Sequence, residues 1–168
     1  MRDAASWAVV TGASGGLGAE LADRLAARGH PVVITARSAA ALDAVADRIR
    51  RAHDVEVIVE ALDLSVAGSA VALRDRLDER GIDPEILVNN AGFGLSGAFI
   101  ENDPGRLREM LQLNIVSLTE LSHIYGRRMA ARGGGRILLV CSRRPTSPIR
   151  CSPPMAPRRP MCCRSARH

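Results

Sequence analysis

The amino-acid sequence predicts an α/β fold in which a parallel β-sheet is covered by helices on both faces. Short apolar runs alternate along the chain with stretches in which apolar residues recur every three or four positions, as expected for buried strands and amphipathic helices. Glycines follow several of the helical stretches, and glycine commonly ends a helix. The 168 residues, 46% of them hydrophobic, suffice for one domain with a buried core.

The first strand and the first helix are expected on either side of a glycine-rich turn. The apolar run Trp7–Val10 predicts a buried strand, and residues 16–28 predict a helix that ends before Gly29. The core-facing stripe of this helix is expected to be Leu17, Leu21 and Leu25.

The next two strands are expected to enclose a second helix. Residues 31–36 predict a buried strand, and Ser38 is placed to cap a helix over residues 39–52. Residues 55–61 predict a third strand, in which polar positions such as Glu60 alternate with apolar ones. The inward-facing residues of the second helix are expected to be Leu42, Val45, Ala46 and Ile49.

The remaining elements continue the alternation of strands and helices. Residues 66–80 predict a third helix and residues 85–88 a fourth strand. A long helix is expected over residues 103–132, followed by a fifth strand over residues 136–141. With right-handed crossovers, these elements give a Rossmann-type doubly wound parallel sheet of strand order 3-2-1-4-5, incomplete at its C-terminal edge.

Residues 11–18, which read T-G-A-S-G-G-L-G, connect the first strand to the first helix. Glycines at such a corner allow a tight turn, close approach of a ligand to the main chain, and close packing of helix on strand. The free N–H groups and the positive dipole end of the helix then favour an anion, such as the pyrophosphate of a dinucleotide. The residues expected to bind it are Gly12, Ser14, Gly16, Leu17 and Gly18.

Two motifs match those of a known protein family. Residues 11–18 fit T-G-x-x-x-G-x-G, and N-N-A-G stands at Asn89–Gly92, although two adjacent asparagines can also simply build a turn. On these motifs, residues 7–142 resemble the short-chain dehydrogenase/reductase family. The resemblance implies hydride transfer between a nicotinamide dinucleotide and a small-molecule carbonyl or alcohol, with Asn90, Ala91 and Gly92 at the cofactor site. It also implies that an intact member can form a homo-oligomer.

Further cofactor contacts are expected just past the strands, where ligands bind in such sheets. Arg37 follows the second strand, and an arginine there accepts a 2′-phosphate, which favours NADP(H) with NAD(H) as the second choice. The alternative is a solvated arginine at a helix start. Asp63 and Leu64 follow the third strand, and the resemblance implies that Asp63 binds the adenine edge. The alternative is an aspartate that interacts with a helix dipole.

Two positions match catalytic residues of the family. Asn114 is expected on the apolar face of the long helix, and the resemblance implies that its main chain holds a water of the proton relay. The alternative is a core amide with satisfied hydrogen bonds. Ser142 follows the fifth strand, and the resemblance implies that its hydroxyl orients the substrate carbonyl.

The acid/base pair of the family is absent from this sequence. The family pattern is Y-x-x-x-K, in which the lysine lowers the pKa of the tyrosine. A phenol of pKa about 10 needs such a nearby cation to serve near neutral pH. The chain has one tyrosine, Tyr125, which is followed four residues later by Met129, and it has no lysine. We therefore expect Tyr125 to be a partly buried residue of the long helix.

Residues 143–168 differ in composition from the rest of the chain. They hold six of the nine prolines and seven arginines without one acidic residue. One interpretation is a disordered basic tail. The other is that one base was lost from the gene near Arg143 or Arg144, so that a foreign reading frame follows and the family domain is truncated.

The residues of the tail allow a test of the second interpretation. Reading every codon one base earlier turns the ATG codons of Met155 and Met161 into NAT, which includes tyrosine, and yields a string compatible with Y-G-A-T-K-A-Y-V-L. This places a tyrosine at position 155, 13 residues after Ser142, and a lysine at position 159, the spacing of the family. We therefore expect a dinucleotide-binding domain over residues 1–142 and a foreign-frame tail over residues 143–168.

Charge and cysteine content argue against several other functions. The net charge is +5, but residues 1–142 hold 16 arginines and 18 acidic residues, so the basic character belongs to the tail. Without interleaved aromatic residues, the tail does not predict nucleic-acid binding. No apolar run approaches the roughly 20 residues that span a bilayer, and the cysteines have no zinc-ligand spacing. We expect a cytoplasmic protein without a metal site or a membrane partner.

The sequence thus predicts an oxidoreductase of the short-chain dehydrogenase/reductase type. The chain as written is expected to be inactive and unstable, because it lacks the acid/base pair and because the fifth strand would be an uncovered edge. The alternative is a non-catalytic dinucleotide-binding or regulatory protein.

Overall fold

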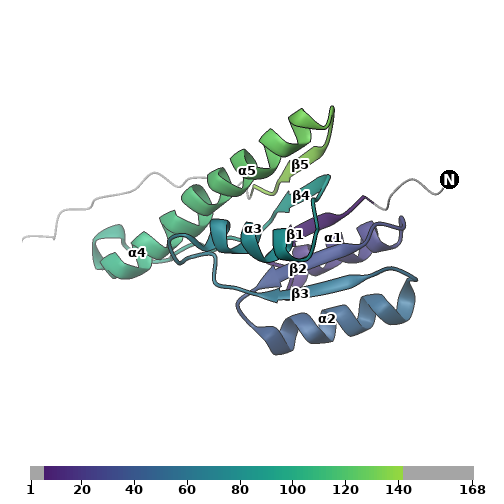
Figure 1. Cartoon of the computed structure of the whole chain (residues 1–168). Helices are drawn as coiled ribbons and strands as arrows, with labels where there is room; N and C mark the ends of the chain where they lie inside the picture. Colours follow the sequence, from purple (N-terminus) through teal and green to yellow (C-terminus); the bar gives the residue numbers. More distant parts are fainter. Residues whose placement is uncertain (1–5, 142–168) are drawn as a thin grey trace, which may run out of the picture.

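Five parallel strands form a single sheet in the order β3-β2-β1-β4-β5, as predicted (Figure 1). The structure is a computed structural model that describes residues 6–141. The strands are β1 (Ala8–Thr11), β2 (Val32–Ala36), β3 (Val57–Ala61), β4 (Ile86–Asn89) and β5 (Arg136–Leu139). Because the strands are parallel, their carboxyl ends meet at one edge of the sheet.

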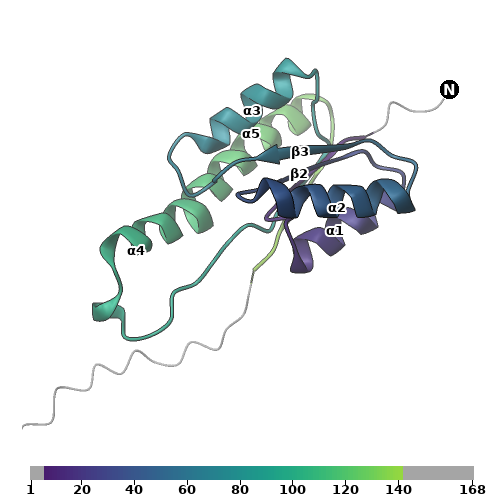
Figure 2. The ribbon, with the colours of Figure 1, turned by 90° about the horizontal axis from the view of Figure 1, so that it is seen from below.

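Helices cover both faces of this sheet (Figure 2). α1 (Gly16–Ala26) and α2 (Ala39–Ala52) lie on one face, and α3 (Ser69–Glu79) and α5 (Leu118–Ala131) lie on the other. Successive residues of β1 point to opposite faces: Val10 packs in the core under α1 and α2, whereas Val9 packs in the core under α3 and α5. No helix within residues 6–141 has the length and apolar character needed to cross a membrane.

The buried face of α1 differs from the predicted leucine stripe. Leu17 is 54% exposed, and Leu21 and Leu25 are only partly buried. The buried residues of α1 are instead the small ones, Gly18, Ala19, Ala22 and Ala26. Small side chains let the helix axis approach the sheet closely, so the leucines flank the contact rather than fill it.

The second helix and its cap agree with the prediction. The four residues expected to face inward on α2 are all buried. The Ser38 hydroxyl accepts a hydrogen bond from the N–H of Ala41 at 3.3 Å. Glu60, expected at a polar position of β3, is 4% exposed, because Arg76 and Arg80 of the α3 region cover its carboxylate, each at 3.2 Å. α3 itself begins at Ser69, not at residue 66 as predicted.

The predicted long helix is divided into three consecutive parts. α4 (Pro104–Leu111) is followed by a π-helical segment, η2 (Gln112–Ser117), and then by α5. Asp103 caps α4 by accepting a hydrogen bond from the N–H of Arg106 at 2.9 Å. A short 3₁₀ turn, η1 (Phe99–Glu101), precedes α4. The wider π turn changes which residues of η2 and α5 face the sheet.

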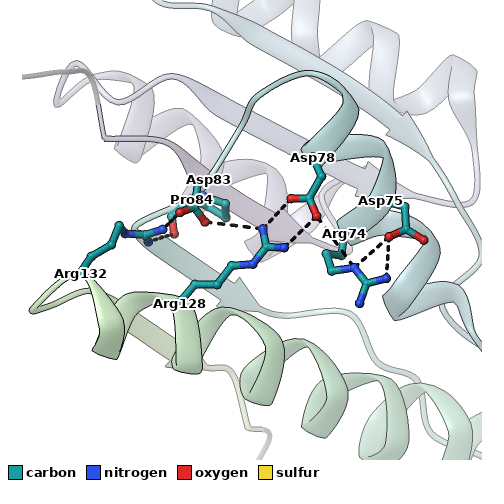
Figure 3. Close-up of polar contacts among 7 residues, drawn as sticks. All are labelled: Arg74, Asp75, Asp78, Asp83, Pro84, Arg128 and Arg132. Atoms are coloured by element: carbon teal, nitrogen blue, oxygen red, sulfur yellow. Dashed lines mark hydrogen bonds and ion pairs between the residues drawn. The ribbon is translucent and has the colours of Figure 1, made fainter.

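A chain of ion pairs joins α5 to α3 and to the loop before β4 (Figure 3). Arg128 of α5 donates two hydrogen bonds to the carboxylate of Asp78 on α3, at 2.5 and 2.7 Å. Arg132 pairs with Asp83 and donates to the carbonyl oxygen of Pro84 at 2.8 Å. These contacts fix α5 against the loop that leads into β4.

The sheet is open beyond β5 within the described part of the chain. β5 pairs with β4, and no other strand of residues 6–141 lies on its outer side. Its residues Ile137, Leu138 and Leu139 are between 39% and 47% exposed. Within residues 6–141, β5 is therefore the edge strand on this side of the sheet.

Candidate functional site

A cleft of about 280 Å³ opens at the carboxyl ends of β1 to β4. Eight of the eleven residues expected at a cofactor site line it: Gly12, Ser14, Arg37, Asp63, Leu64, Asn90, Ala91 and Gly92. Five further lining residues were not predicted to belong to a cofactor site: Ala36, Ser38, Leu62, Phe93 and Leu113. Gly16, Leu17 and Gly18 do not line the cleft but belong to the first turn of α1. The fold thus gathers residues from four strand ends around one cavity.

The glycine-rich loop packs tightly against the end of β4. Gly12 has a φ of 66°, in the left-handed region that favours glycine, and a Cβ on it would lie 2.8 Å from the Cα of Ala91. A Cβ on Gly18 would lie 2.3 Å from the carbonyl oxygen of Gly12 and 2.5 Å from the Nδ2 of Asn90. Both positions therefore require glycine for close packing of loop, helix and sheet.

The N-terminus of α1 has no side-chain cap. Gly15 precedes the helix and offers no side-chain acceptor, whereas Ser38 caps α2 and Asp103 caps α4. The first turn of α1 also contains no acidic residue. Its N–H groups lack intrahelical partners, and the helix dipole is positive at this end. This end of the helix is therefore suited to a phosphate group.

Hydrogen bonds between Thr11–Gly12 and Asn90–Ala91 hold the glycine-rich loop in place. The Asn90 Nδ2 donates to the carbonyl oxygens of Thr11 and Gly12, at 3.0 and 3.1 Å. The Thr11 hydroxyl oxygen accepts from the N–H groups of Asn90 and Ala91, at 3.0 and 2.9 Å. The side chain of Asn90 is thus bound to the loop, and its direct effect is to shape the cleft.

Asn89 has a separate structural role that the sequence did not reveal. It is 3% exposed, and its Nδ2 donates to the Ser122 hydroxyl at 2.9 Å and to the carbonyl oxygen of Leu118 at 3.3 Å. Asn89 therefore ties β4 to α5. Its position in the strand could have indicated this role. Successive strand residues point to opposite faces, so only one of two adjacent asparagines can face the loop.

Arg37 and Asp63 place opposite charges on one wall of the cleft. Arg37 is exposed, and the Oδ1 of Asp63 accepts from the N–H and the hydroxyl of Ser65, at 2.9 and 2.6 Å. Partial burial disfavours the charged form of Asp63. The hydrogen bonds from Ser65 and the charges of Arg37 and Arg106 outweigh this effect and hold the pKa of Asp63 below its ordinary value. Asp63 is therefore a carboxylate at neutral pH.

The alternative placement of Asp63 at a helix start does not agree with the structure. α3 begins only at Ser69, so Asp63 does not lie in its first turn. The dipole of α3 acts mainly within that turn. The charge of Asp63 is instead stabilised by the local turn with Ser65.

Asn114 lies at a second cleft, of about 620 Å³, that shares residues 90–93 with the first. Its Oδ1 accepts from the N–H of Phe93 at 3.1 Å, and its Nδ2 donates to the Phe93 carbonyl oxygen at 2.8 Å. Asn114 is half-buried within η2 rather than in the core. Its side chain is satisfied, as in the structural alternative. Cys141 also lines this cleft, and Ser142 follows it but lies outside the described residues.

Tyr125 lies in the core and takes no part in either cleft. It is 0% exposed, which corrects the expected partial burial, and its hydroxyl has no hydrogen-bond partner among residues 6–141. Burial raises the pKa of Tyr125 well above its ordinary value. An acid/base tyrosine needs the opposite shift, so its surroundings do not suit Tyr125 to that role.

Comparison with known proteins gives a consistent result. The profile of the short chain dehydrogenase family matches residues 6–153, which extends past the boundary at residue 142 expected from the motifs. A very-long-chain 3-oxoacyl-CoA reductase of Podospora anserina is 33% identical over 146 residues, covering 85% of this chain and 43% of that protein. A galactitol 2-dehydrogenase of Cereibacter sphaeroides is 32% identical over 132 residues, covering 78% of this chain and 50% of that protein. This chain therefore spans half or less of the length of these two relatives.

A solved structure shows a similar fold. The short-chain dehydrogenase from Sphingobium yanoikuyae, in complex with NADPH, superposes with a TM-score of 0.76 at 36% sequence identity. The match covers 82% of this chain and 54% of that chain.

Proposed function

This chain belongs to the short-chain dehydrogenase family, and we propose that it binds NADP(H) in the cleft at the carboxyl ends of β1 to β4. The observation that carries the proposal is the uncapped N-terminus of α1 beside a cleft lined by an exposed arginine and an ionised aspartate. The solved relative that contains NADPH supports it.

The residues around the cleft fit the parts of such a dinucleotide. The first-turn N–H groups of α1 would hold the pyrophosphate. Arg37 would hold the 2′-phosphate, and no acidic residue stands directly after β2 to hold a ribose 2′-OH instead. The ionised Asp63 would accept a hydrogen bond from the adenine amino group. These roles favour NADP(H) over NAD(H).

The proposed reaction of the complete family domain is hydride transfer with a carbonyl or alcohol. NADP(H), when bound, supplies or accepts the hydride at its nicotinamide ring. Asn114 would hold a water by its main chain at the second cleft, and Ser142 would orient the substrate oxygen. A tyrosine and a lysine would move the proton, and this chain has neither in the required pattern. We therefore expect the chain as written to have no turnover.

The missing pair is best explained by a shift of reading frame after Ser142. The support is that the shifted frame is compatible with a tyrosine at position 155 and a lysine at position 159, the spacing of the family. A second candidate function, a non-catalytic dinucleotide-binding protein, is favoured by one observation, the absence of lysine from the whole chain. Both candidates share the cofactor cleft and differ only in catalysis.

A binding and turnover experiment tests these proposals together. Calorimetric titration of the purified 168-residue chain should show tighter binding of NADPH than of NADH, because Arg37 can pair with the 2′-phosphate. The same preparation should not oxidise NADPH with a panel of ketones and aldehydes. Restoring one base near codon 143 should create turnover.

The outcomes separate the candidates. Turnover by the chain as written would contradict the expectation that it is inactive for lack of the acid/base pair. Binding without turnover, even after the frame is restored, favours the non-catalytic protein. Absence of NADPH binding in both proteins refutes the proposed function.

A further inference from the structure

Ser117 is a buried serine whose hydroxyl contacts the main chain of Leu64, a residue that lines the cofactor cleft. It is 1% exposed and ends the π-helical segment η2. Its hydroxyl donates a hydrogen bond to the carbonyl oxygen of Leu64 at 2.7 Å, and it accepts one from the Nε2 of Gln112 at 3.2 Å. Ser117 thus connects the helix that follows η2 to the loop that follows β3.

The acceptor of this bond belongs to the wall of the cleft. Leu64 is 4% exposed, lines the cleft, and directly follows Asp63. The carboxylate of Asp63 is engaged by Ser65 on the other side of Leu64. The main chain at residues 63–65 is therefore fixed at two points, one within the loop and one by Ser117.

The π turn gives two polar side chains of η2 different targets. Asn114 binds the main chain of Phe93, in the segment after β4, whereas Ser117 binds the main chain of Leu64, in the segment after β3. Both segments line the cleft. η2 is therefore attached to two walls of the cleft by separate hydrogen bonds.

There is little free space around Ser117. A cavity of only about 10 Å³ lies beside it, lined in part by Thr11, Asn89 and Ala91. This volume is about the minimum that a water needs. A shift of Leu64 towards Ser117 is blocked by this packing, and a shift away from it breaks a buried hydrogen bond. The serine hydroxyl therefore sets the position of Leu64.

We propose that Ser117 is a positioning residue for the adenosine half of the dinucleotide. It acts through the carbonyl oxygen of Leu64 and fixes the Asp63–Leu64 wall at the distance that an adenine nucleotide requires. The inference rests on the proposed NADP(H) site and names a residue of that site that neither the glycine-rich motif nor the asparagine motif includes.

The test measures affinity for the adenosine half alone, with 2′,5′-ADP as the probe. Ser117→Ala removes the hydroxyl and leaves the carbonyl oxygen of Leu64 without its donor. We expect the dissociation constant for 2′,5′-ADP to rise about tenfold, the equivalent of about 1.4 kcal/mol for one buried hydrogen bond. Ser117→Cys, with a weaker donor of similar size, should give an intermediate value.

Ser122→Ala is the matched control. Ser122 lies on the same side of the molecule in α5 and also makes internal hydrogen bonds, to Leu118 and from Asn89, but it does not contact the cleft wall. Both alanine variants should lower Tm. Titrations at a temperature well below the Tm of every variant should show weaker 2′,5′-ADP binding by Ser117→Ala and unchanged binding by Ser122→Ala.

Each outcome has a distinct meaning. Unchanged affinity in folded Ser117→Ala, or equal weakening in both alanine variants, overturns the positioning role while the proposed function stands. If Ser117→Ala does not fold, Ser117→Cys decides the matter by the same comparison. Failure of the unmodified chain to bind either 2′,5′-ADP or NADPH refutes the proposed function and this inference with it.

Discussion

Gly18 shows at the scale of one residue how the glycine-rich loop is built. A methyl group on Gly18 would meet the main-chain oxygen of Gly12 at 2.3 Å, and neither group can move without moving the loop. We expect Gly18→Ala to lower the free energy of unfolding by about 1–3 kcal/mol, the range for overpacking a tight interior, and to weaken NADPH binding strongly. Urea unfolding and calorimetric titration measure the two effects.

Gly15→Ala is the control for this substitution. Gly15 lies three residues away, has a φ of 172° that any residue adopts, and would place a Cβ with no atom within 4 Å. The free energy of unfolding of Gly15→Ala should stay close to that of the unmodified chain. An equal loss of stability in the two variants would contradict the steric explanation.

Residue types alone identified most of the cleft but not the attachments behind it. Gly12 was predicted from the glycine-rich motif and Arg37 from its place after the second strand, whereas Asp63 was predicted from the family resemblance. Ser117 was not predicted, because a serine within a helical stretch has no distinctive signal and its partner is a main-chain oxygen 53 residues away. Contacts of this kind depend on tertiary structure.

At the scale of elements, the ion pair between Arg128 and Asp78 attaches α5 to α3 (Figure 3). The hydrogen bonds from Arg128 lower the pKa of Asp78, with a smaller opposing effect of desolvation. An aspartate whose pKa is lowered on folding stabilises the fold above its unfolded pKa of about 3.9. That contribution is lost as the pH falls through the folded pKa.

The lowered pKa of Asp78 leads to a prediction for Asp78→Asn. The substitution should destabilise the protein at pH 7 by at most about 1 kcal/mol, because the pair is partly exposed. The difference from the unmodified chain should shrink as the pH falls below about 4. Asp75→Asn is the control, since Asp75 pairs with Arg74 of its own helix. Urea unfolding at pH 7 and near pH 3 measures both, and a gap that grows in acid would contradict the assignment.

The order of the elements could be predicted, but their details could not. Periodicity identified the five strands and four helical regions, and Ser38 and Asp103 marked two helix starts. The π turn over residues 112–117 was missed, because one wider turn hardly changes the apolar period. The prediction that leucines form the buried stripe of α1 was wrong. Close contact with the sheet requires small residues on that face, and hydrophobicity alone does not indicate this.

At the scale of the whole molecule, the described chain contains a cofactor half with an open edge. Within residues 6–141 the sheet ends at β5, whose apolar side chains are partly exposed. The chain spans half or less of the length of the two relatives compared. An open apolar edge favours pairing with other chains. The chain nevertheless holds the strand ends and the helix start that the proposed binding requires. We therefore expect cofactor binding without turnover from the chain as written.

Hydrogen exchange of the 168-residue chain, with and without saturating NADPH, tests the central claim most directly. If the cleft is the dinucleotide site, NADPH should slow amide exchange in residues 12–18, 62–65 and 90–93, which come from three separate loops. Exchange in the C-terminal half of α2 should not change, because α2 borders the cleft only at its N-terminal end, where Ser38 caps it. Unchanged exchange in residues 12–18 at saturating NADPH, or slowing confined to another surface, would contradict the account.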